Sequence, residues 1–367
     1  MAEKTRKRKA DHIRIATAYD VQAKNIKTGF EDIHFIHKAL PEIDKDEIDL
    51  SVNAFSHAFK APIIVDAMTG GTPKAEKINA IIATAVEKLG LGMGVGSQRA
   101  ALEDKKLVRT FAIVRKKAPT AFIIANIGAV QLVRGYSISE VKKAIEMIEA
   151  DAIAIHLNSL QEAIQPEGET SFKGILGKIK EITLQLDKPV IVKETGAGIA
   201  SEEAKKLEAV GVKGINVSGA GGTSFAAVEY YRAKEIANNA QSKLGETFWD
   251  WGIPTAVSLI EVIQSVRVPV IASGGLRNGL DIAKALSLGA SLAGFAHPIL
   301  TAALNGGEEN VEKTLTLIIE ELRNTMFLVG AKDCHALRHV PVVITGKTAE
   351  WLRIRGFRID EYARRGR

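Results

Sequence analysis

A short apolar run followed by an amphipathic stretch recurs eight times along this chain, from residue 62 onward. Continuous apolar runs are typical of parallel strands, because helices cover both faces of a parallel sheet. Eight such strand–helix units predict an α/β fold, a closed (β/α)8 TIM barrel. An open doubly wound sheet is the structural alternative, although it usually has fewer strands. The predicted strands are residues 62–68, 91–97, 121–128, 152–158, 189–194, 214–219, 269–275 and 291–297.

The segments outside these units complete the organisation of the chain. Residues 1–61 precede the barrel, and we expect them to form an N-terminal arm and a segment that closes the barrel bottom. Long loops follow strand 4, at 159–173, and strand 6, at 220–252. The barrel and a helical segment after about residue 300 make up residues 62–367. We therefore predict a single domain.

Composition limits the class of protein and its compartment. Aromatic residues are 5% of the 367 residues, whereas hydrophobic residues are 46%, which suits the aliphatic interior of a barrel. The single cysteine, Cys334, excludes an intrachain disulfide and favours a reducing compartment. No apolar stretch reaches the ~20 residues needed to span a bilayer, and no secretory signal follows the basic start. We expect a soluble, cytoplasmic protein without a membrane partner.

Basic residues gather at the two ends of the chain and supply much of its formal net charge of +6. Solvated tails, a nucleic-acid contact and an anionic substrate are the possible explanations. The basic start has no aromatic stacking residues nearby, so we expect no nucleic-acid partner.

Polar residues fall at the C-terminal ends of the predicted strands. These ends meet at one face of a barrel, where barrel enzymes build their active sites. Polar residues with only structural roles would be scattered along the strands instead. The sequence therefore predicts an active site at this face. The polar positions are Thr69, Ser97, Gln98, Arg99, Asn126, His156, Asn158, Lys193, Glu194, Ser218, Ser273 and His297.

The ends of strands 7 and 8 indicate a phosphate site. Gly274 and Gly275 expose backbone N–H groups just before a predicted helix, whose N-terminus favours negative charge. Arg277 adds a cation, and the loops after strands 7 and 8 are the usual phosphate site of barrels. The pattern predicts a bound phosphate but not the molecule that carries it.

Lys193 ends an otherwise apolar strand, where it is either a Schiff-base former or a cation that faces an anionic cofactor. Asn126 and Ser218 at other strand ends, and Thr223 in the loop after strand 6, have polar groups that suit the heteroatoms of a flavin ring. FMN therefore fits these residues better than a Schiff base does.

The segment HLNSLQEAIQPEGE carries the most specific pattern. His156 and Asn158 share one face of a strand, and Gln161 and Glu162 follow in the loop. A carboxylate beside a phosphate-binding mouth suggests Mg²⁺ shared with substrate oxygens. Taken singly, Glu162 would be a solvated acid and Gln161 a hydrogen-bonding loop amide.

Motifs along nearly the whole chain together resemble those of the type II isopentenyl diphosphate isomerases. No single motif is decisive, but the set stands in the same order and is highly specific. The resemblance implies a (β/α)8 barrel, FMN in its reduced form, Mg²⁺, and a homo-oligomer, commonly a tetramer or octamer. The motifs are RKADH near the start, MTGG at 68–71, GVGSQR at 94–99, ANIG at 125–128, HLNSLQE with PEGE at 156–169, KETGAGI at 193–199, SGAGGTS at 218–224, DWGIPTA at 250–256 and SGGLRNGLD at 273–281.

The resemblance also implies roles for individual residues, with the metal at Glu162. It places FMN against Ala67, Met68, Thr69, Ser97, Asn126, Lys193, Ser218, Thr223, Gly274, Gly275, Leu276, Arg277, Ala296 and His297. It places the substrate against Arg8, Lys9, His12, Ser97, Gln98, Arg99 and Gln161. Asp66–Ala67, Phe225 and His297 depart from the family pattern, in which Thr-Gly, Trp and an apolar residue are usual.

The expected reaction converts isopentenyl diphosphate into dimethylallyl diphosphate. The double bond moves by one carbon without net electron flow, so we expect reduced FMN to act as an acid and base, with NADPH or NADH as its reductant. Gln161 is the candidate for relaying or orienting the proton, and His156 and Asn158 would position Gln161 and the diphosphate.

Two other classes of protein remain as alternatives. A different FMN barrel enzyme, such as a 2-hydroxyacid oxidase or an IMP dehydrogenase, would share the fold. The second of these needs a cysteine in the loop after strand 6, which reads SGAGGTSF, and His297 is the only hint of the first. A non-catalytic phosphate-binding or nucleic-acid-binding protein would use the basic ends alone.

Overall fold

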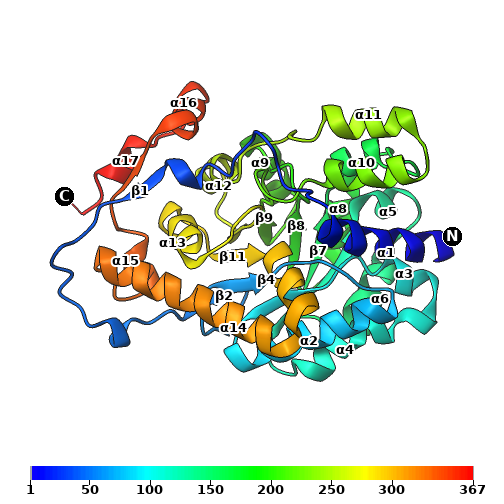
Figure 1. The fold of residues 1–367 in the computed structure, drawn as a ribbon, viewed down its shortest axis with the longest axis horizontal. Helices are drawn as coiled ribbons and strands as arrows, with labels where there is room; N and C mark the ends of the chain where they lie inside the picture. The colour runs from blue at the N-terminus through cyan, green and yellow to red at the C-terminus, as the bar shows by residue number, and fades with distance from the viewer. Residues whose placement is uncertain (1, 367) are drawn as a thin grey trace.

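The computed structural model describes the backbone of residues 2–366 and the side chains of residues 7–366. Its centre is a closed barrel of eight parallel strands in the order β10-β11-β4-β5-β6-β7-β8-β9 (Figure 1). Each strand lies within one of the eight predicted ranges, so the predicted (β/α)8 barrel is confirmed. The strands are β4 (Ile63–Val65), β5 (Gly92–Gly94), β6 (Phe122–Gly128), β7 (Ala152–His156), β8 (Val190–Lys193), β9 (Gly214–Asn216), β10 (Val270–Ala272) and β11 (Leu292–Phe295).

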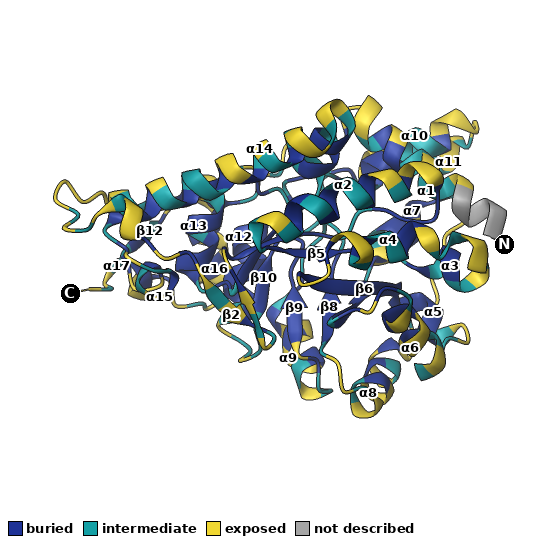
Figure 2. Ribbon diagram, turned by 90° about the horizontal axis from the view of Figure 1, so that it is seen from below, coloured by how far each residue is buried: buried dark blue, intermediate teal, exposed yellow. Residues whose placement is uncertain are grey.

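The barrel strands are buried because helices cover their outer side (Figure 2). Local signals set the helix ends. Thr72 caps α2 by accepting a hydrogen bond from Ala75 N, and Gly90 ends this helix in the left-handed conformation. The covering helices are α2 (Pro73–Leu89), α4 (Arg109–Lys117), α6 (Ile138–Met147), α8 (Ile175–Gln185), α9 (Ser201–Ala209), α12 (Thr255–Ile263), α13 (Gly279–Leu288) and α14 (His297–Val329), which is kinked at Gly306 and Gly307.

The two long connections are largely helical. The segment after β7 holds α7 (Ser159–Ile164), and the segment after β9 holds α10 (Phe225–Glu235) and α11 (Asn239–Thr247). Both of the latter begin with a side-chain cap, which satisfies one free backbone N–H group in the first helical turn. Shorter elements follow two other strands: α3 (Arg99–Glu103) and η3 (Lys105–Leu107) follow β5, and α5 (Ala129–Val133) follows β6.

The N-terminal segment covers both ends of the barrel. Strands β2 (Val52–Ala54) and β3 (His57–Phe59) form an antiparallel hairpin. From this hairpin, Phe55 stacks on Phe122 at the start of β6, and Phe59 meets the same ring edge to face. These rings fill the N-terminal end of the barrel. At the opposite end lies helix α1 (Ala2–Ala18), which is the part of the N-terminal segment expected to form an arm. The prediction that residues 1–61 and 62–367 together form a single domain stays a prediction.

The C-terminal segment is helical except for one short strand. Strand β12 (Val342–Ile344) pairs with β1 (Ile33–Phe35), which lies some 300 residues earlier in the chain. A pairing of such distant segments leaves no local signal in the sequence. The remaining elements are η1 (Phe30–Asp32), η2 (Lys45–Glu47), α15 (Cys334–Leu337), α16 (Gly346–Ile354) and α17 (Asp360–Ala363).

Crossing a bilayer requires a long helix with an apolar surface. Within residues 2–366, no helix meets both requirements.

Candidate active site

A cavity of about 250 Å³ opens at the C-terminal ends of the barrel strands, beneath helix α1. With one exception, every residue predicted to contact FMN, the substrate or the metal lines it. The exception is Gln98, whose side chain is fully buried behind the cavity wall. Gln98 Nε2 donates to Ala144 O at 2.7 Å, and its Oε1 accepts from Asn126 N at 2.9 Å. Gln98 therefore supports the wall at Asn126 instead of facing the cavity.

His156 is held as a neutral imidazole. The Asn126 side chain donates to Val95 O at 3.0 Å, which turns its oxygen toward His156 Nδ1 at 2.8 Å. His156 Nδ1 is therefore the protonated nitrogen. Burial, with further contributions from the Lys193 and Lys9 cations, lowers the pKa of His156 to about 3. His156 thus offers a fixed hydrogen-bonding edge and no acidic proton near neutral pH.

Asn158 connects the two residues with predicted catalytic and metal-binding roles. Its amide nitrogen lies 3.3 Å from Gln161 Oε1 and 3.0 Å from Glu162 Oε1. The His156 side chain hydrogen-bonds to Asn126 instead, although both His156 and Asn158 line the cavity. The difference arises because β7 ends at His156 and Asn158 is the N-cap residue of α7.

Glu162 is a buried carboxylate with several hydrogen-bond donors around it. It accepts from Asn158 Nδ2, from the Gln165 amide and, at 2.7 Å, from Glu169 N. The described residues contain no group of three or more His, Cys, Asp or Glu side chains that could hold a metal. A single carboxylate fits Mg²⁺ only where substrate oxygens and water complete its shell, and this is the usual arrangement for Mg²⁺ on phosphates.

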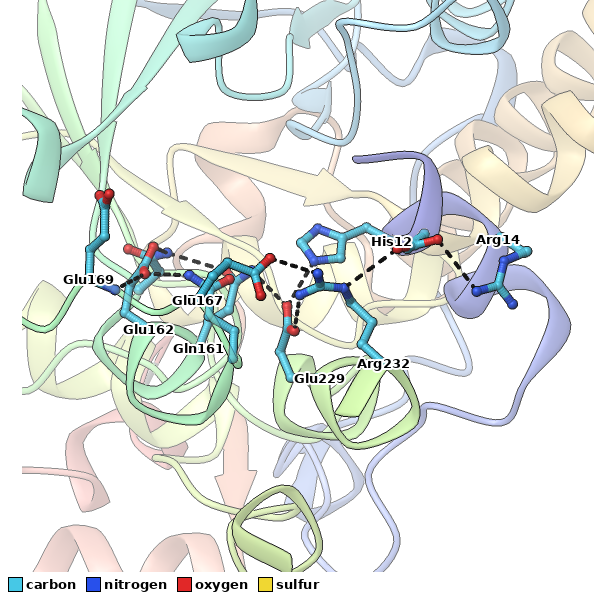
Figure 3. Close-up of polar contacts among 11 residues, drawn as sticks. His12, Arg14, Gln161, Glu162, Glu167, Glu169, Glu229 and Arg232 are labelled. Atoms are coloured by element: carbon cyan, nitrogen blue, oxygen red, sulfur yellow. Dashed lines mark hydrogen bonds and ion pairs between the residues drawn. The ribbon is translucent and has the colours of Figure 1, made fainter. Parts of the chain in front are cut away.

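Glu229 on α10 is a site residue that the sequence did not indicate (Figure 3). It is fully buried and lies 2.8 Å from His12 Nε2, 2.5 Å from Arg232 Nη1 and 3.4 Å from Gln161 Nε2. Burial alone would raise its pKa, but His12 and Arg232 outweigh burial and lower it. The only local signal was a Glu–Arg pair at i,i+3, which is also typical of an exposed helix face.

Arg232 extends this cluster to two other elements (Figure 3). It donates to Glu167 in the loop after α7 at 2.6 Å and lies 3.9 Å from Asp11 on α1. Helix α1 is therefore tied to the cavity rim by His12 and Asp11. His297 adds a further tie, because its Nε2 donates to Ala16 O on α1 at 2.9 Å.

The cationic part of the cavity lies under helix α1. Lys9 donates to Ser97 O, while Arg8 lines the cavity beside it. Desolvation, followed by the repulsion from Arg8, lowers the pKa of Lys9 to about 7. Arg99 is instead paired with Glu103 at 2.8 Å and with Glu169 at 3.1 Å.

Lys193 extends from the end of β8 into the cavity. Its ammonium donates to Glu194 O at 2.8 Å and lies 3.8 Å from Asp66 Oδ2. Both side chains are buried, so water screens this pair little.

The backbone around the predicted phosphate site can receive an anion. Asn278 caps α13, whereas the first turn of α14 accepts no side-chain cap, and its N-cap residue Ala296 lines the cavity. Within that turn Pro298 has no N–H group and Ile299 N donates to Ala296 O at 3.1 Å, so the turn offers an anion little beyond the N–H group of His297. Gly274 and Gly275 have φ angles of 101° and 79°, which L side chains rarely adopt. The residues present therefore fit the phosphate of FMN.

The fold and this cavity define a flavin-type (β/α)8 barrel, and the comparisons agree. Residues 140–343 match the family described as FMN-dependent dehydrogenase. The solved structure of a flavocytochrome b2 mutant superposes with a TM-score of 0.67 at 17% identity, covering 93% of this chain and 84% of that one. This structural likeness shows the fold alone. The chain belongs to the FMN-dependent dehydrogenase family.

Relatives with higher sequence identity assign the chain to a more specific family. An isopentenyl-diphosphate delta-isomerase of Methanosarcina barkeri is 50% identical over 363 residues, covering 99% of this chain and 98% of the relative. Another, from Pyrococcus abyssi, is 51% identical over 359 residues and 96% of each chain. The chain belongs to the isopentenyl-diphosphate delta-isomerase family, which confirms the resemblance found in its motifs.

Proposed function

We propose that this chain isomerises isopentenyl diphosphate to dimethylallyl diphosphate with FMN bound in the barrel cavity. The main support is the near-complete match to relatives of that name, at about half identical residues. The reaction adds a proton to the terminal carbon of the double bond and removes one from the allylic carbon, so electrons balance without an oxidant. When bound in its reduced form, FMN supplies the acid–base group for these proton transfers.

The chain's own residues would bind and orient the two molecules. Lys193, Asn126, Ser218 and Thr223 would hold the flavin ring, and residues 274–277 with 296–297 its phosphate. Arg8, Lys9, His12 and Arg99 would bind the diphosphate. This assignment suits Lys9, because an anion would offset the desolvation and repulsion that lower its pKa.

The remaining partners belong to the same proposal. Glu162 would share Mg²⁺ with the diphosphate, and NADPH or NADH would reduce the flavin. We also propose that the protein is cytoplasmic and forms a homo-oligomer, either a tetramer or an octamer. It would have no nucleic-acid partner.

The test is anaerobic incubation of the FMN-loaded, reduced protein with isopentenyl diphosphate and Mg²⁺, followed by product analysis. Dimethylallyl diphosphate should form, and omission of FMN or of the reductant should abolish it. A protein that binds FMN but oxidises a 2-hydroxy acid instead would contradict the proposal.

Lys193→Ala should weaken FMN binding, because it removes the ammonium group at the end of β8. The loss of one charge-assisted contact is worth about 1.5–3 kcal/mol, or at least tenfold in Kd. Fluorescence titration of the apoprotein with FMN measures it. Lys213→Ala, at the exposed start of β9, is the matched control. Unchanged affinity in Lys193→Ala would remove Lys193 from the flavin site.

Arg8→Ala and Lys9→Ala should each raise the KM for isopentenyl diphosphate by about tenfold, through loss of a charge-assisted contact. Bound FMN should stay near the wild-type level. Lys7→Ala, which changes an exposed cation on the same helix, is the control. Wild-type kinetics in the Arg8/Lys9 double variant would mean that these cations do not bind the substrate and belong to a solvated tail.

The same steady-state experiment has a pH dependence. Because the pKa of Lys9 is lowered to about 7, its ammonium is present below that pH and is lost as the pH rises. The wild-type KM should therefore increase above about pH 7, and Lys9→Ala should flatten this rise. An identical pH profile in the two proteins would contradict a role for the Lys9 charge.

A further inference from the structure

We propose that Asp66 is a positioning residue that weakens the effect of Lys193 on the flavin and so keeps bound FMN harder to reduce. This inference rests on the proposed FMN site.

Asp66 follows β4 directly and is 8% exposed. Its Oδ1 accepts from Ala67 N at 2.7 Å, and its Oδ2 accepts from Asn216 Nδ2 at 3.1 Å. Asn216 is in turn fixed by Ser273 Oγ, which donates to its oxygen at 2.6 Å. The carboxylate is thus held directly by Ala67 N and by Asn216 of β9, and has little freedom to turn away.

The ion pair crosses the barrel. Strands β4 and β8 stand opposite each other in the strand order, yet Asp66 Oδ2 lies 3.8 Å from Lys193 Nζ. Both side chains line the same cavity. Lys193 therefore presents its charge to the cavity with a fixed counter-charge beside it.

Among the described residues that line the cavity, no second carboxylate forms an ion pair with Lys193. Besides Asp66, the one lining carboxylate is Glu162, which accepts hydrogen bonds from Asn158, Gln165 and Glu169 N and pairs with no part of Lys193. The adjacent Glu194 turns its Oε2 to the N–H groups of residues 195–197. Asp66 alone of these carboxylates is placed to offset the ammonium.

A cation beside a flavin favours the reduced state, which carries more negative charge, and a carboxylate beside that cation opposes this preference. Neutralising Asp66 should therefore strengthen the binding of reduced FMN relative to oxidised FMN.

The test is the midpoint potential of FMN bound to Asp66→Asn and Asp66→Ser. The first keeps the shape of Asp66, and the second keeps an acceptor for Ala67 N without an amide facing Asn216. Each should favour reduced over oxidised FMN by about tenfold more than wild type, a rise of about 30 mV for a two-electron couple. Thermal unfolding checks that both fold. Glu202→Gln, which removes an exposed acid on α9, should not shift the potential.

A double-mutant cycle with Lys193→Met shows whether Asp66 changes the flavin potential through Lys193 or independently of it. If Asp66 acts through Lys193, Asp66→Asn should shift the potential much less in the Lys193→Met background. Wild-type potentials in both Asp66 variants, or an undiminished shift without Lys193, would overturn the inference. Wild-type protein that binds no FMN would instead overturn the proposed function.

Discussion

Replacing Gln161 with alanine is expected to lower kcat by about 10²–10⁴-fold, the usual cost of losing one general acid–base contribution. Binding of FMN and the dependence on Mg²⁺ should stay near those of wild type. Gln161 is nearly buried, and its amide lies between Asn158 at 3.3 Å and Glu229 at 3.4 Å. Both separations are long for hydrogen bonds, so the amide is free to bond to a substrate or cofactor instead.

The structure sharpens this prediction through Glu229. A neutral amide is a poor acid, but the contact of its nitrogen with the buried Glu229 carboxylate, which His12 also contacts, sets the direction in which Gln161 can orient a proton. Gln161→Glu should consequently not restore the rate, because it would place a second carboxyl group against Glu229.

Steady-state kinetics with FMN and Mg²⁺ titrations measure the effect, and Gln185→Ala on the exposed end of α8 is the control. Turnover of Gln161→Ala at the wild-type rate would leave the proton transfers to the flavin alone.

Glu162→Gln is expected to lower activity by about 100-fold at limiting Mg²⁺, because an amide keeps the shape but lacks the charge that holds a hard cation. Excess Mg²⁺ should recover part of this loss by mass action. Full recovery is not expected, since the new amide nitrogen must face one of the donors that now contact Glu162.

Mg²⁺ titrations of kcat and KM, with thermal unfolding to verify the fold, check this result. Glu181→Gln on the exposed face of α8 is the matched control. A loss in Glu162→Gln that Mg²⁺ leaves unchanged, together with rescue of Gln161→Ala by Mg²⁺, would mean that the two neighbours have exchanged roles.

The sequence predicted the barrel well because each unit carries its own signal. A buried parallel strand requires a continuous apolar run, and a covering helix requires an amphipathic one, so both periods can be read locally. The polar strand ends were also readable. Topology brings such ends to one face, and the structure places Asn126, Lys193 and Ser218 around one cavity there.

What the sequence alone determined is therefore the set of strands, the face of the barrel that holds the cavity and the residue types that line it. The tertiary structure decided which side chains meet. It turned Gln98 behind the wall, brought Glu229 from α10 against His12 of α1, and set Asp66 beside Lys193 across the barrel. These contacts join residues far apart in the chain, and their energies depend on burial and on rotamers that the surrounding packing selects. No local pattern of residues encodes either quantity.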